Sequence, residues 1–259
     1  IVFFGHSKLG MDVAARGLKN GKKVILETSG SDATLVWHDA DLKKSADDIF
    51  NTRFIGSGQF CIATKRVFVH SSVYEELIER LLAKVKNIKN GLPSDPGCEQ
   101  SPIGKVNIVS HLENIVNEAK DEGASVITGG HVADYTGATS KADIFYQPTI
   151  LTNVNQRMRV MQEEVFGPVL PITKIDSLPQ AVQLINDSSF GLRSSIWSTD
   201  KNIVAFFIRN IDAGGIIVNS DHYYTSTHTP HLGGTKFSGI TGAKYFSDEM
   251  CFNKFVHSP

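Results

Sequence analysis

The sequence predicts an α/β protein of three layers, α/β/α, in which helices cover both faces of a mostly parallel sheet. Three observations support this class. Short apolar runs typical of buried strands alternate with helical patterns from Ile1 to about Asn219, as in parallel sheets with crossover helices. The 259 residues are 41% hydrophobic, which is enough to bury a large core. No run approaches the roughly 18 apolar residues of a membrane span, so we predict no membrane partner.

The first elements predict a partial Rossmann-like βαβ unit. Ile1–Phe4 is a short apolar run, a helical pattern extends from Leu9 to Leu18, and Lys23–Glu27 is typical of a second buried strand. Parallel strands joined by one helix make this unit. Because the chain begins at Ile1, inside a predicted strand, we expect it to be a fragment of something longer.

The turn after the first strand has a pattern that suits a phosphate. Gly5 and His6 would stand at a helix N-terminus, where backbone amides and the helix dipole receive anions. The interval from Gly5 to Gly10 imitates a P-loop, but Met11 stands where that motif needs lysine. The sequence therefore excludes nucleoside-triphosphate hydrolysis.

The remaining elements continue the alternation. Strands are predicted at Thr34–Trp37, Arg66–His70, Ser125–Thr128, Ile150–Val154, Val169–Ile175, Ser194–Ser198 and Gly215–Asn219. Helices are predicted at Asp41–Phe54, Ser72–Ile88, Val109–Ala119, Leu178–Asn186 and Lys201–Asn210. Ser72 and Glu75 predict a capping box at the start of their helix. After Asn219 the pattern breaks, and Lys244–Val256 is expected to form a last strand or a docking tail.

The charge balance and the cysteine content limit the kinds of partner that the sequence predicts. Lys and Arg number 26 against 27 Asp and Glu, so there is no basic field for nucleic acid or a membrane surface, and the predicted ligand is a small molecule. Cys61, Cys98 and Cys251 are odd in number and form no CxxC pattern. This argues against a disulfide framework and a structural zinc site, and it favours a reducing, cytoplasmic location.

One cysteine stands on a loop instead of inside an apolar run. Cys61 follows Gly56, Gly58 and a polar amide, between a predicted helix and a predicted strand. Such a loop leaves room for a substrate carbonyl and for backbone N–H groups aimed at it. The alternative is an unreactive core thiol. An activated thiolate is expected to react with iodoacetamide faster than Cys98 or Cys251.

Glu27 is the second candidate. It ends a predicted apolar strand, at the carboxyl edge where open α/β sheets place their ligands. The alternative is a structural carboxylate that caps the next turn with Ser29 and Gly30.

Four ordered segments carry a family resemblance. Three of them resemble signatures of the aldehyde dehydrogenase superfamily: Glu27-Thr28-Ser29-Gly30, Gly58-Gln59-Phe60-Cys61 and Glu163-Glu164-Val165-Phe166-Gly167-Pro168-Val169. Gly233-Gly234-Thr235-Lys236-Phe237-Ser238-Gly239 resembles a fourth. The resemblance runs from Ile1 to about Val256.

The resemblance implies an NAD- or NADP-dependent oxidation of an aldehyde to a carboxylic acid. Cys61 would add to the aldehyde and, after hydride transfer to the nicotinamide, would carry a thioester. Glu27 would activate the water that hydrolyses this thioester. The Cys61 backbone N–H would meet the oxyanion, together with an amide that the family supplies from farther upstream.

The resemblance also implies the cofactor contacts. Glu164 and Phe166 correspond to the family's clamp on the nicotinamide ribose, whereas without the resemblance the acidic pair indicates an exposed turn. Gly5 and Gly10 correspond to its helix-start glycines beside the pyrophosphate. His6 departs from the small hydroxyl residue that is usual there, and it would crowd or contact the phosphate.

Other departures concern the site's surroundings. Thr28 and Ser29 replace the family's usual Leu-Gly after the glutamate, and this affects the path of that turn. The pair Lys65 and Arg66 follows Cys61 as in several semialdehyde-oxidising members, although a structural role at a strand start is the alternative. The loop with His222, His228 and His231 is expected to hold no metal. Together with Tyr223 and Tyr224, these histidines would border the substrate tunnel.

The resemblance implies three parts: residues 1–28 as the end of the dinucleotide-binding domain, 29–232 as the catalytic domain, and 233–259 as a return to the cofactor domain plus an oligomerisation tail. Family members are about twice as long and form homo-oligomers through a C-terminal strand, for which Phe252–Val256 is the candidate. The isolated chain is expected to bind NAD weakly and to turn over slowly or not at all. A CoA-acylating enzyme and a non-catalytic interaction module are the alternatives.

Overall fold

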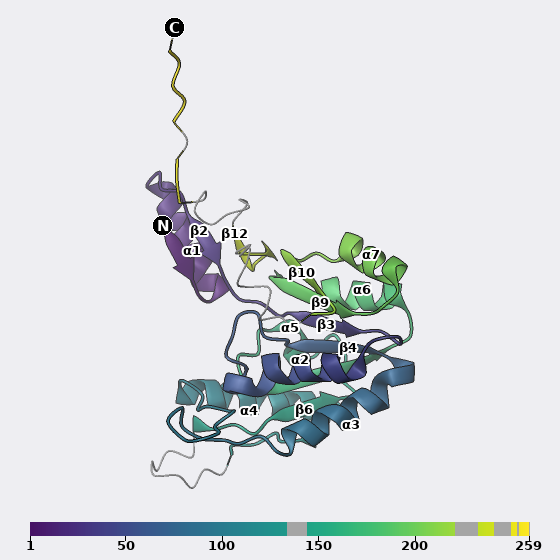
Figure 1. Ribbon diagram of the computed structural model, residues 1–259. Coiled ribbons are helices and arrows are strands. Elements are labelled where there is room, and N and C mark those ends of the chain that lie inside the picture. Colours follow the sequence, from purple (N-terminus) through teal and green to yellow (C-terminus); the bar gives the residue numbers. More distant parts are fainter. Residues whose placement is uncertain (134–143, 221–232, 241–249, 253, 259) are drawn as a thin grey trace.

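The structure is a computed structural model that describes residues 1–133, 144–220, 233–240, 250–252 and 254–258. Its centre is a seven-stranded sheet in the order β10-β9-β3-β4-β7-β6-β5, with helices on both faces (Figure 1). The predicted three-layer α/β/α class is confirmed.

The strands of this sheet lie close to their predicted positions. They are β3 (Ala33–Val36), β4 (Arg66–His70), β5 (Ser125–Thr128), β6 (Thr149–Thr152), β7 (Val169–Ile175), β9 (Arg193–Trp197) and β10 (Gly215–Val218). Every neighbouring pair is parallel except the pair at the edge, where β5 runs antiparallel to β6.

Side chains alternate between the two faces of the sheet. Leu35 and Phe68 belong to one buried cluster, and their neighbours Val36 and Val67 belong to another. Helices α4 (Val106–Asp121), α6 (Leu178–Asn186) and α7 (Lys201–Asn210) contribute to the first cluster, and α2 (Leu42–Phe54) and α3 (Tyr74–Val85) to the second. Strands buried on both faces explain why the sequence shows continuous apolar runs instead of alternation.

A smaller sheet adjoins the large one. It contains β1 (Val2–Phe4), β2 (Ile25–Glu27) and β12 (Gly239–Ile240), and helix α1 (Ser7–Lys19) packs on β1 and β2. β1 and β2 are parallel, as the predicted βαβ unit requires, whereas β12 returns from the far end of the chain and pairs antiparallel with β2. This return places the segment 233–240 beside Glu27.

The predicted capping box is wrong. A 3₁₀ turn, Ser71–Val73, precedes α3, and the N-cap of α3, Val73, makes no side-chain cap. Instead the ring of His70 accepts a hydrogen bond from the Ser72 N–H at 3.2 Å. The motif was misassigned because the strand ends directly in this turn, so the capping side chain is His70, two residues before Ser72.

Short elements went unpredicted because they show no periodicity. They are α5 (Arg159–Gln162), the paired strands β8 (Phe190–Gly191) and β11 (Thr235–Lys236), and β12. The described residues between 250 and 258 form no strand. None of the helices in the described ranges has the length and apolar character needed to cross a membrane. The predicted tunnel-bordering residues His222, Tyr223, Tyr224, His228 and His231 lie outside the described residues.

Candidate active site

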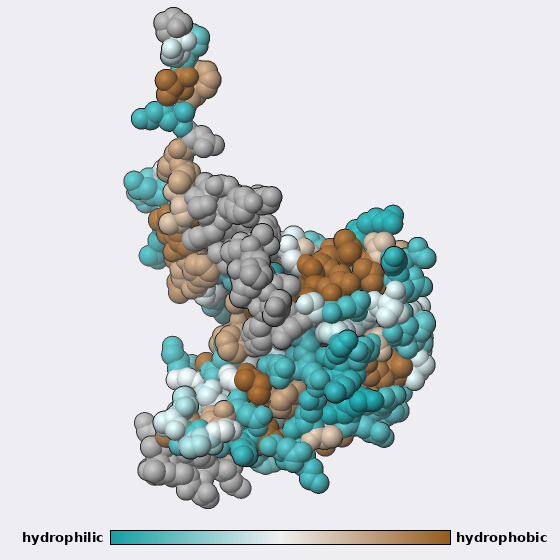
Figure 2. Space-filling model, viewed as in Figure 1, coloured by the Kyte–Doolittle hydropathy of each residue, from teal (hydrophilic) through white to brown (hydrophobic). Residues whose placement is uncertain are grey.

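The predicted site residues gather around one cavity. Its volume is about 1130 Å³, and it opens between the small sheet and the large one, where Figure 2 shows a hollow in the surface. Glu27, Cys61, Glu164 and Phe166 line it, as do residues at the start of α1 and α4. The carboxyl ends of β1 and β2 therefore face the segments that lead into β4, β7 and β9 of the large sheet.

The turn before Cys61 has an unusual backbone. Gly56, Ser57 and Gly58 have φ angles of 62°, 59° and 61°, in the left-handed region that glycine tolerates best. Ser57 takes this conformation while its hydroxyl donates a hydrogen bond to the carbonyl of Ser101. Three successive left-handed residues reverse the chain after α2 and bring Cys61 to the cavity.

Gly58 is expected to tolerate no side chain. A Cβ atom there would overlap the carbonyl oxygen of Arg53. We expect Gly58→Ala to lower the free energy of unfolding by about 3 kcal/mol, from backbone strain and the steric clash together. Gly21→Ala is the matched control, because Gly21 has a φ angle of 65° and its added methyl group would meet no atom within 4 Å. Urea unfolding measures both, and equal losses would contradict the clash.

The thiol of Cys61 contacts the carboxylate of Glu27. The Sγ atom donates a hydrogen bond to Glu27 Oε1 at 3.4 Å. Burial and the negative charge of Glu27 raise the pKa of the thiol to about 11, against the opposing charge of Lys65. Cys61 is therefore protonated at neutral pH, and its faster alkylation stays a prediction. Because the folded protein binds this proton more tightly than the unfolded chain does, the protonated thiol adds to the free energy of unfolding. This contribution is complete below pH 9.0 and is lost as the pH rises through about 11.

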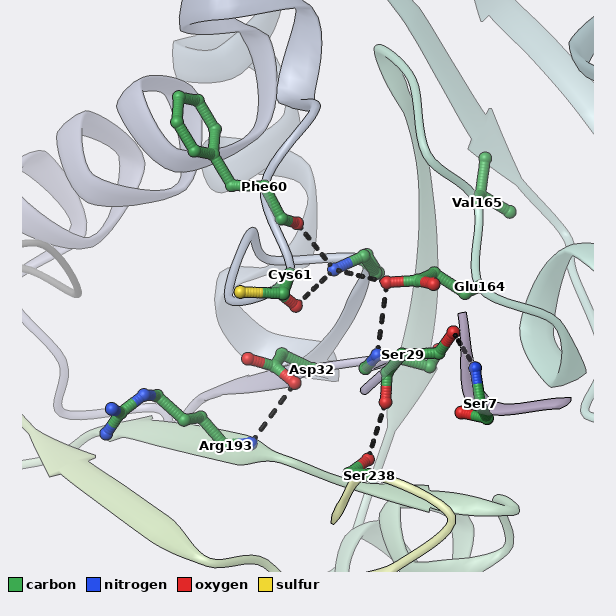
Figure 3. A network of polar contacts seen from close by, with 12 residues as sticks. Ser7, Ser29, Asp32, Phe60, Cys61, Glu164, Val165, Arg193 and Ser238 are labelled. Carbon is green, nitrogen blue, oxygen red and sulfur yellow. Dashed lines mark hydrogen bonds and ion pairs between the residues drawn. The ribbon is translucent and has the colours of Figure 1, made fainter. Parts of the chain in front are cut away.

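Several hydrogen bonds fix the turn that follows Glu27. Thr28 Oγ1 donates to the carbonyl of Phe237 at 2.6 Å, and the Thr28 N–H donates to the carbonyl of Ser238 at 3.1 Å. Ser29 accepts from the Ser7 N–H at its hydroxyl and from the Ser238 hydroxyl at its carbonyl. Thr28 and Ser29 thus tie the turn to α1 and to the returning segment. Figure 3 shows the contacts of Ser29 with Ser7 and Ser238.

The second carboxylate oxygen of Glu27 is available for a further contact. Glu27 is 9% exposed, and its Oε2 atom is buried with no hydrogen-bond partner among the described residues. A buried carboxylate oxygen without a donor is costly, so a water or ligand donor fits this position.

Glu164 is held by two groups across the cavity wall. Its Oε1 atom accepts a hydrogen bond from the Gly30 N–H at 3.1 Å and lies 3.6 Å from Lys65 Nζ. Figure 3 shows its carboxylate pointing toward the loop of Cys61. The buried guanidinium of Arg53 braces the same segment, donating to the carbonyls of Val165 at 3.0 Å and Val169 at 2.7 Å.

The start of α1 forms another part of the wall. Gly5 and His6 line the cavity, and His6 is the N-cap of α1, with its ring accepting from the Lys8 N–H at 3.3 Å. Gly10 does not line the cavity. A Cβ on Gly10 would lie 2.7 Å from the Thr28 side chain, so its lack of a side chain lets α1 approach the turn after β2.

Two basic residues after Cys61 are fully buried. Arg66 donates to the carbonyls of Ser31 and Ile185 and joins β4 to α6, which agrees with the structural alternative for this residue. Lys65 is different, because its ammonium group contacts the carbonyl of Cys61.

Sequence reasoning missed several residues of the wall. Asn107, Ile108 and His111 come from the first turns of α4, and Ser189 and Phe190 come from the start of β8. No local pattern marks them, because only the packing of α4 against the sheet brings them to the cavity.

Other features of the described residues lie apart from this site. Another cavity, of about 440 Å³, is lined by residues of α3, β6 and β7 and contains none of the predicted site residues. Within the described ranges, no group of three or more His, Cys, Asp or Glu residues is placed to hold a metal ion. Cys61, Cys98 and Cys251 are all free thiols.

Comparison with known proteins gives consistent matches. The model of the aldehyde dehydrogenase family matches residues 1–256. The 3-sulfolactaldehyde dehydrogenase of Priestia megaterium is 34% identical over 98% of this chain and 51% of its own length. The chain spans about half the length of the curated relatives it matches.

Solved structures agree. A 3,6-anhydro-L-galactose dehydrogenase in complex with NADP has a TM-score of 0.89 and 33% identity, covering 96% of this chain and 51% of its own. A betaine aldehyde dehydrogenase from Staphylococcus aureus in complex with NAD⁺ has a TM-score of 0.85 and 30% identity. The match covers 92% of this chain and 48% of that protein's chain.

Proposed function

Because the chain belongs to the aldehyde dehydrogenase family, we propose that its protein oxidises an aldehyde to a carboxylic acid with NAD or NADP, through a thioester on Cys61. One observation supports this most. The Cys61 thiol donates its hydrogen bond to a buried carboxylate, that of Glu27, at 3.4 Å on the wall of a cavity. A nucleophile beside a base is the arrangement that covalent catalysis requires.

In the first step Cys61 adds to the aldehyde. The Sγ atom forms a bond to the carbonyl carbon, its proton passes to Glu27 Oε1, and the carbonyl oxygen becomes the oxyanion of a thiohemiacetal. The Cys61 backbone N–H stabilises this oxyanion. Transfer to Glu27 removes the need for a free thiolate, which the raised pKa of the thiol makes scarce at neutral pH.

The residues around the cavity fit a dinucleotide. The cavity, of about 1130 Å³, reaches from Gly5 and His6 at the α1 N-terminus to Cys61. Gly5 and His6 would meet the pyrophosphate, Gly10 keeps α1 close to the Glu27 turn, and Glu164 with Phe166 would hold the ribose and the ring beside it. When bound, nicotinamide accepts the hydride that leaves the thiohemiacetal carbon.

In the last step Glu27 acts on water, after the proton that it took from the thiol has passed to solvent and its carboxylate has formed again. Its Oε2 atom is buried and lacks a donor among the described residues, so a water bound there would deliver its proton to the carboxylate as its oxygen attacks the thioester. The carboxylic acid leaves and Cys61 takes back a proton.

Product analysis tests this function against a CoA-acylating reaction. We expect the natural protein to convert an aldehyde to the free acid while it reduces NAD or NADP. We expect that adding CoA does not change the product. Lactaldehyde, succinate semialdehyde and propanal represent the three substrate classes that remain open. Acyl-CoA as the product would favour the alternative, and no product from any of them would favour a non-catalytic module.

The further assignments rest on the same proposal. Residues 1–28 would complete a dinucleotide-binding domain, 29–232 would be catalytic, and 233–259 would return to the first domain, an arrangement supported by the pairing of β12 with β2. The three free thiols support a reducing, cytoplasmic location. Pairing of copies through Phe252–Val256 stays a prediction.

A further inference from the structure

Lys65 is a buried cation next to the proposed nucleophile. Its side chain is 1% exposed, and lysine is almost never buried this deeply unless it is paired. Its Nζ atom donates to the carbonyl of Phe60 at 2.9 Å and to the carbonyl of Cys61 at 2.5 Å, and it lies 3.6 Å from Glu164 Oε1. Two carbonyl oxygens accept hydrogen bonds from the ammonium group and the Glu164 carboxylate forms an ion pair with it, so all three groups stabilise the charged form.

These contacts fix the backbone on both sides of Cys61. The carbonyl of Phe60 belongs to the peptide that precedes Cys61, and the carbonyl of Cys61 belongs to the peptide that follows it. In a trans peptide the C=O and N–H groups point in opposite directions. Lys65, by holding the Phe60 carbonyl, therefore turns the Cys61 N–H away from itself. That N–H is the proposed oxyanion donor.

Glu164 completes the arrangement from another segment. It binds Lys65 and the Gly30 N–H with the same oxygen, and a Cβ on Gly30 would lie 2.8 Å from the carbonyl oxygen of Cys61. The carboxylate thus contacts both Lys65 and the Gly30 backbone, two groups that lie beside the Cys61 carbonyl. Its charge also offsets part of the positive charge that Lys65 places beside the thiol.

We propose that Lys65 is the positioning residue of Cys61: its ammonium group orients the oxyanion donor and supplies the positive charge that favours the thiolate, while Glu164 moderates that charge. This inference rests on the proposed function for its catalytic part. Its electrostatic part concerns only residues of this chain and applies without cofactor or substrate.

The charges around the two groups set the direction of each effect. Glu27 and Asp32 oppose the thiolate of Cys61, and Lys65 favours it. Burial lowers the pKa of Lys65, while Asp32 and Glu164 raise it and Arg53 lowers it. Removing the cation is therefore expected to raise the pKa of the thiol. Removing the negative charge of Glu164 leaves more of the Lys65 charge acting on the thiol, so we expect it to lower the pKa of the thiol.

The test is the rate of iodoacetamide alkylation at Cys61 as a function of pH, without cofactor, followed by peptide mass spectrometry. We expect Lys65→Met to slow alkylation at pH 8.5 by about tenfold, since one unit of thiol pKa changes the thiolate fraction tenfold. Lys65→Arg keeps the charge and is expected to lose less than about threefold. Glu164→Gln is expected to accelerate alkylation by about threefold or more.

Opposite directions separate this role from a structural one. If Lys65 and Glu164 only held the loop in place, substituting either of them would loosen the loop, and both substitutions would change the alkylation rate in the same direction. Cys98 and Cys251 in the same molecule serve as internal standards, and Lys174→Met, near the other cavity, is the matched lysine control. An unchanged profile in Lys65→Met, or Lys65→Met and Glu164→Gln moving the rate in the same direction, would overturn the proposal.

Turnover gives a second readout. In an active protein, a misaligned oxyanion donor lowers kcat by about a hundredfold with little change in KM. If Lys65→Met fails to fold, which circular dichroism detects, the near-isosteric Glu164→Gln variant still decides by the direction of its alkylation change. A protein that shows the opposed alkylation changes but oxidises no aldehyde would refute the proposed function and leave the positioning role standing.

Discussion

The Cys61→Ala variant is expected to oxidise no aldehyde, with a loss of at least about 10⁴ in kcat relative to the unchanged protein. The reason is chemical: hydride leaves the aldehyde carbon readily only after a nucleophile has made it tetrahedral, and alanine supplies none. Reduction of NAD or NADP in the presence of each candidate aldehyde measures the loss. Binding of the cofactor, followed by calorimetry, should change little, because Cys61 contributes a thiol and not a cofactor contact.

Two matched variants control for the loss of a thiol as such. Cys98→Ala removes another partly buried thiol that donates to the carbonyl of Gly91, and Cys251→Ala removes an exposed one. Both are expected to keep their activity within about twofold. Residual turnover above a few per cent in Cys61→Ala would assign the nucleophile elsewhere.

The Glu27→Gln variant is expected to change two measurements in opposite directions. Turnover should fall by a factor of about 10² to 10⁴, because the amide cannot take a proton from the thiol or from water. Alkylation of Cys61 by iodoacetamide at pH 8.5 should become at least about fivefold faster. Burial and Glu27 together raise the pKa of the thiol to about 11. The amide removes the negative charge and the hydrogen bond that Glu27 contributes, so the thiolate fraction grows.

A structural role for Glu27 predicts another pattern. If the carboxylate only capped its turn, the substitution would loosen the Thr28 and Ser29 contacts and lower stability, with no reason for faster alkylation. Glu113→Gln, on α4, is a matched charge-neutralising control at a site that does not line the cavity. Slower or unchanged alkylation in Glu27→Gln would contradict the contact on which the proposed mechanism depends.

The large sheet was predictable because its strands are buried on both faces. Runs such as Arg66–His70 and Val169–Ile175 are continuous in sequence, and their observed bounds equal the predicted ones. The order of the strands was not predictable in detail. The insertion of β4 and β7 between β3 and β6, and the antiparallel edge at β5, depend on packing between distant segments.

The candidate site was predictable only where it coincides with ordered motifs. Glu27 and Cys61 are 34 residues apart in sequence, and the family resemblance paired them, as does the structure, in which their side chains lie 3.4 Å apart. The protonation state of the thiol was not predictable. It depends on burial and on the direction of the Glu27 carboxylate, which no pattern in the chain encodes.

Lys65 marks the limit of sequence reasoning most clearly. At the start of a strand, a Lys-Arg pair indicates a structural role, and Arg66 has that role through its contacts with Ser31 and Ile185. Lys65 directly precedes this strand, and its side chain ends against Cys61 and Glu164. Two adjacent basic residues thus differ in their surroundings: Arg66 has a structural role, and Lys65 lies beside the proposed nucleophile.

The central claim is that Cys61 carries the acyl group and Glu27 releases it. The most direct test is the mass of the Cys61 peptide from the Glu27→Gln protein after incubation with an aldehyde and NAD or NADP. We expect an acyl adduct on Cys61 that requires the cofactor, because the thioester forms but is hydrolysed slowly. An acyl group on Cys98 or Cys251, or no adduct with lactaldehyde, succinate semialdehyde or propanal, would contradict the claim.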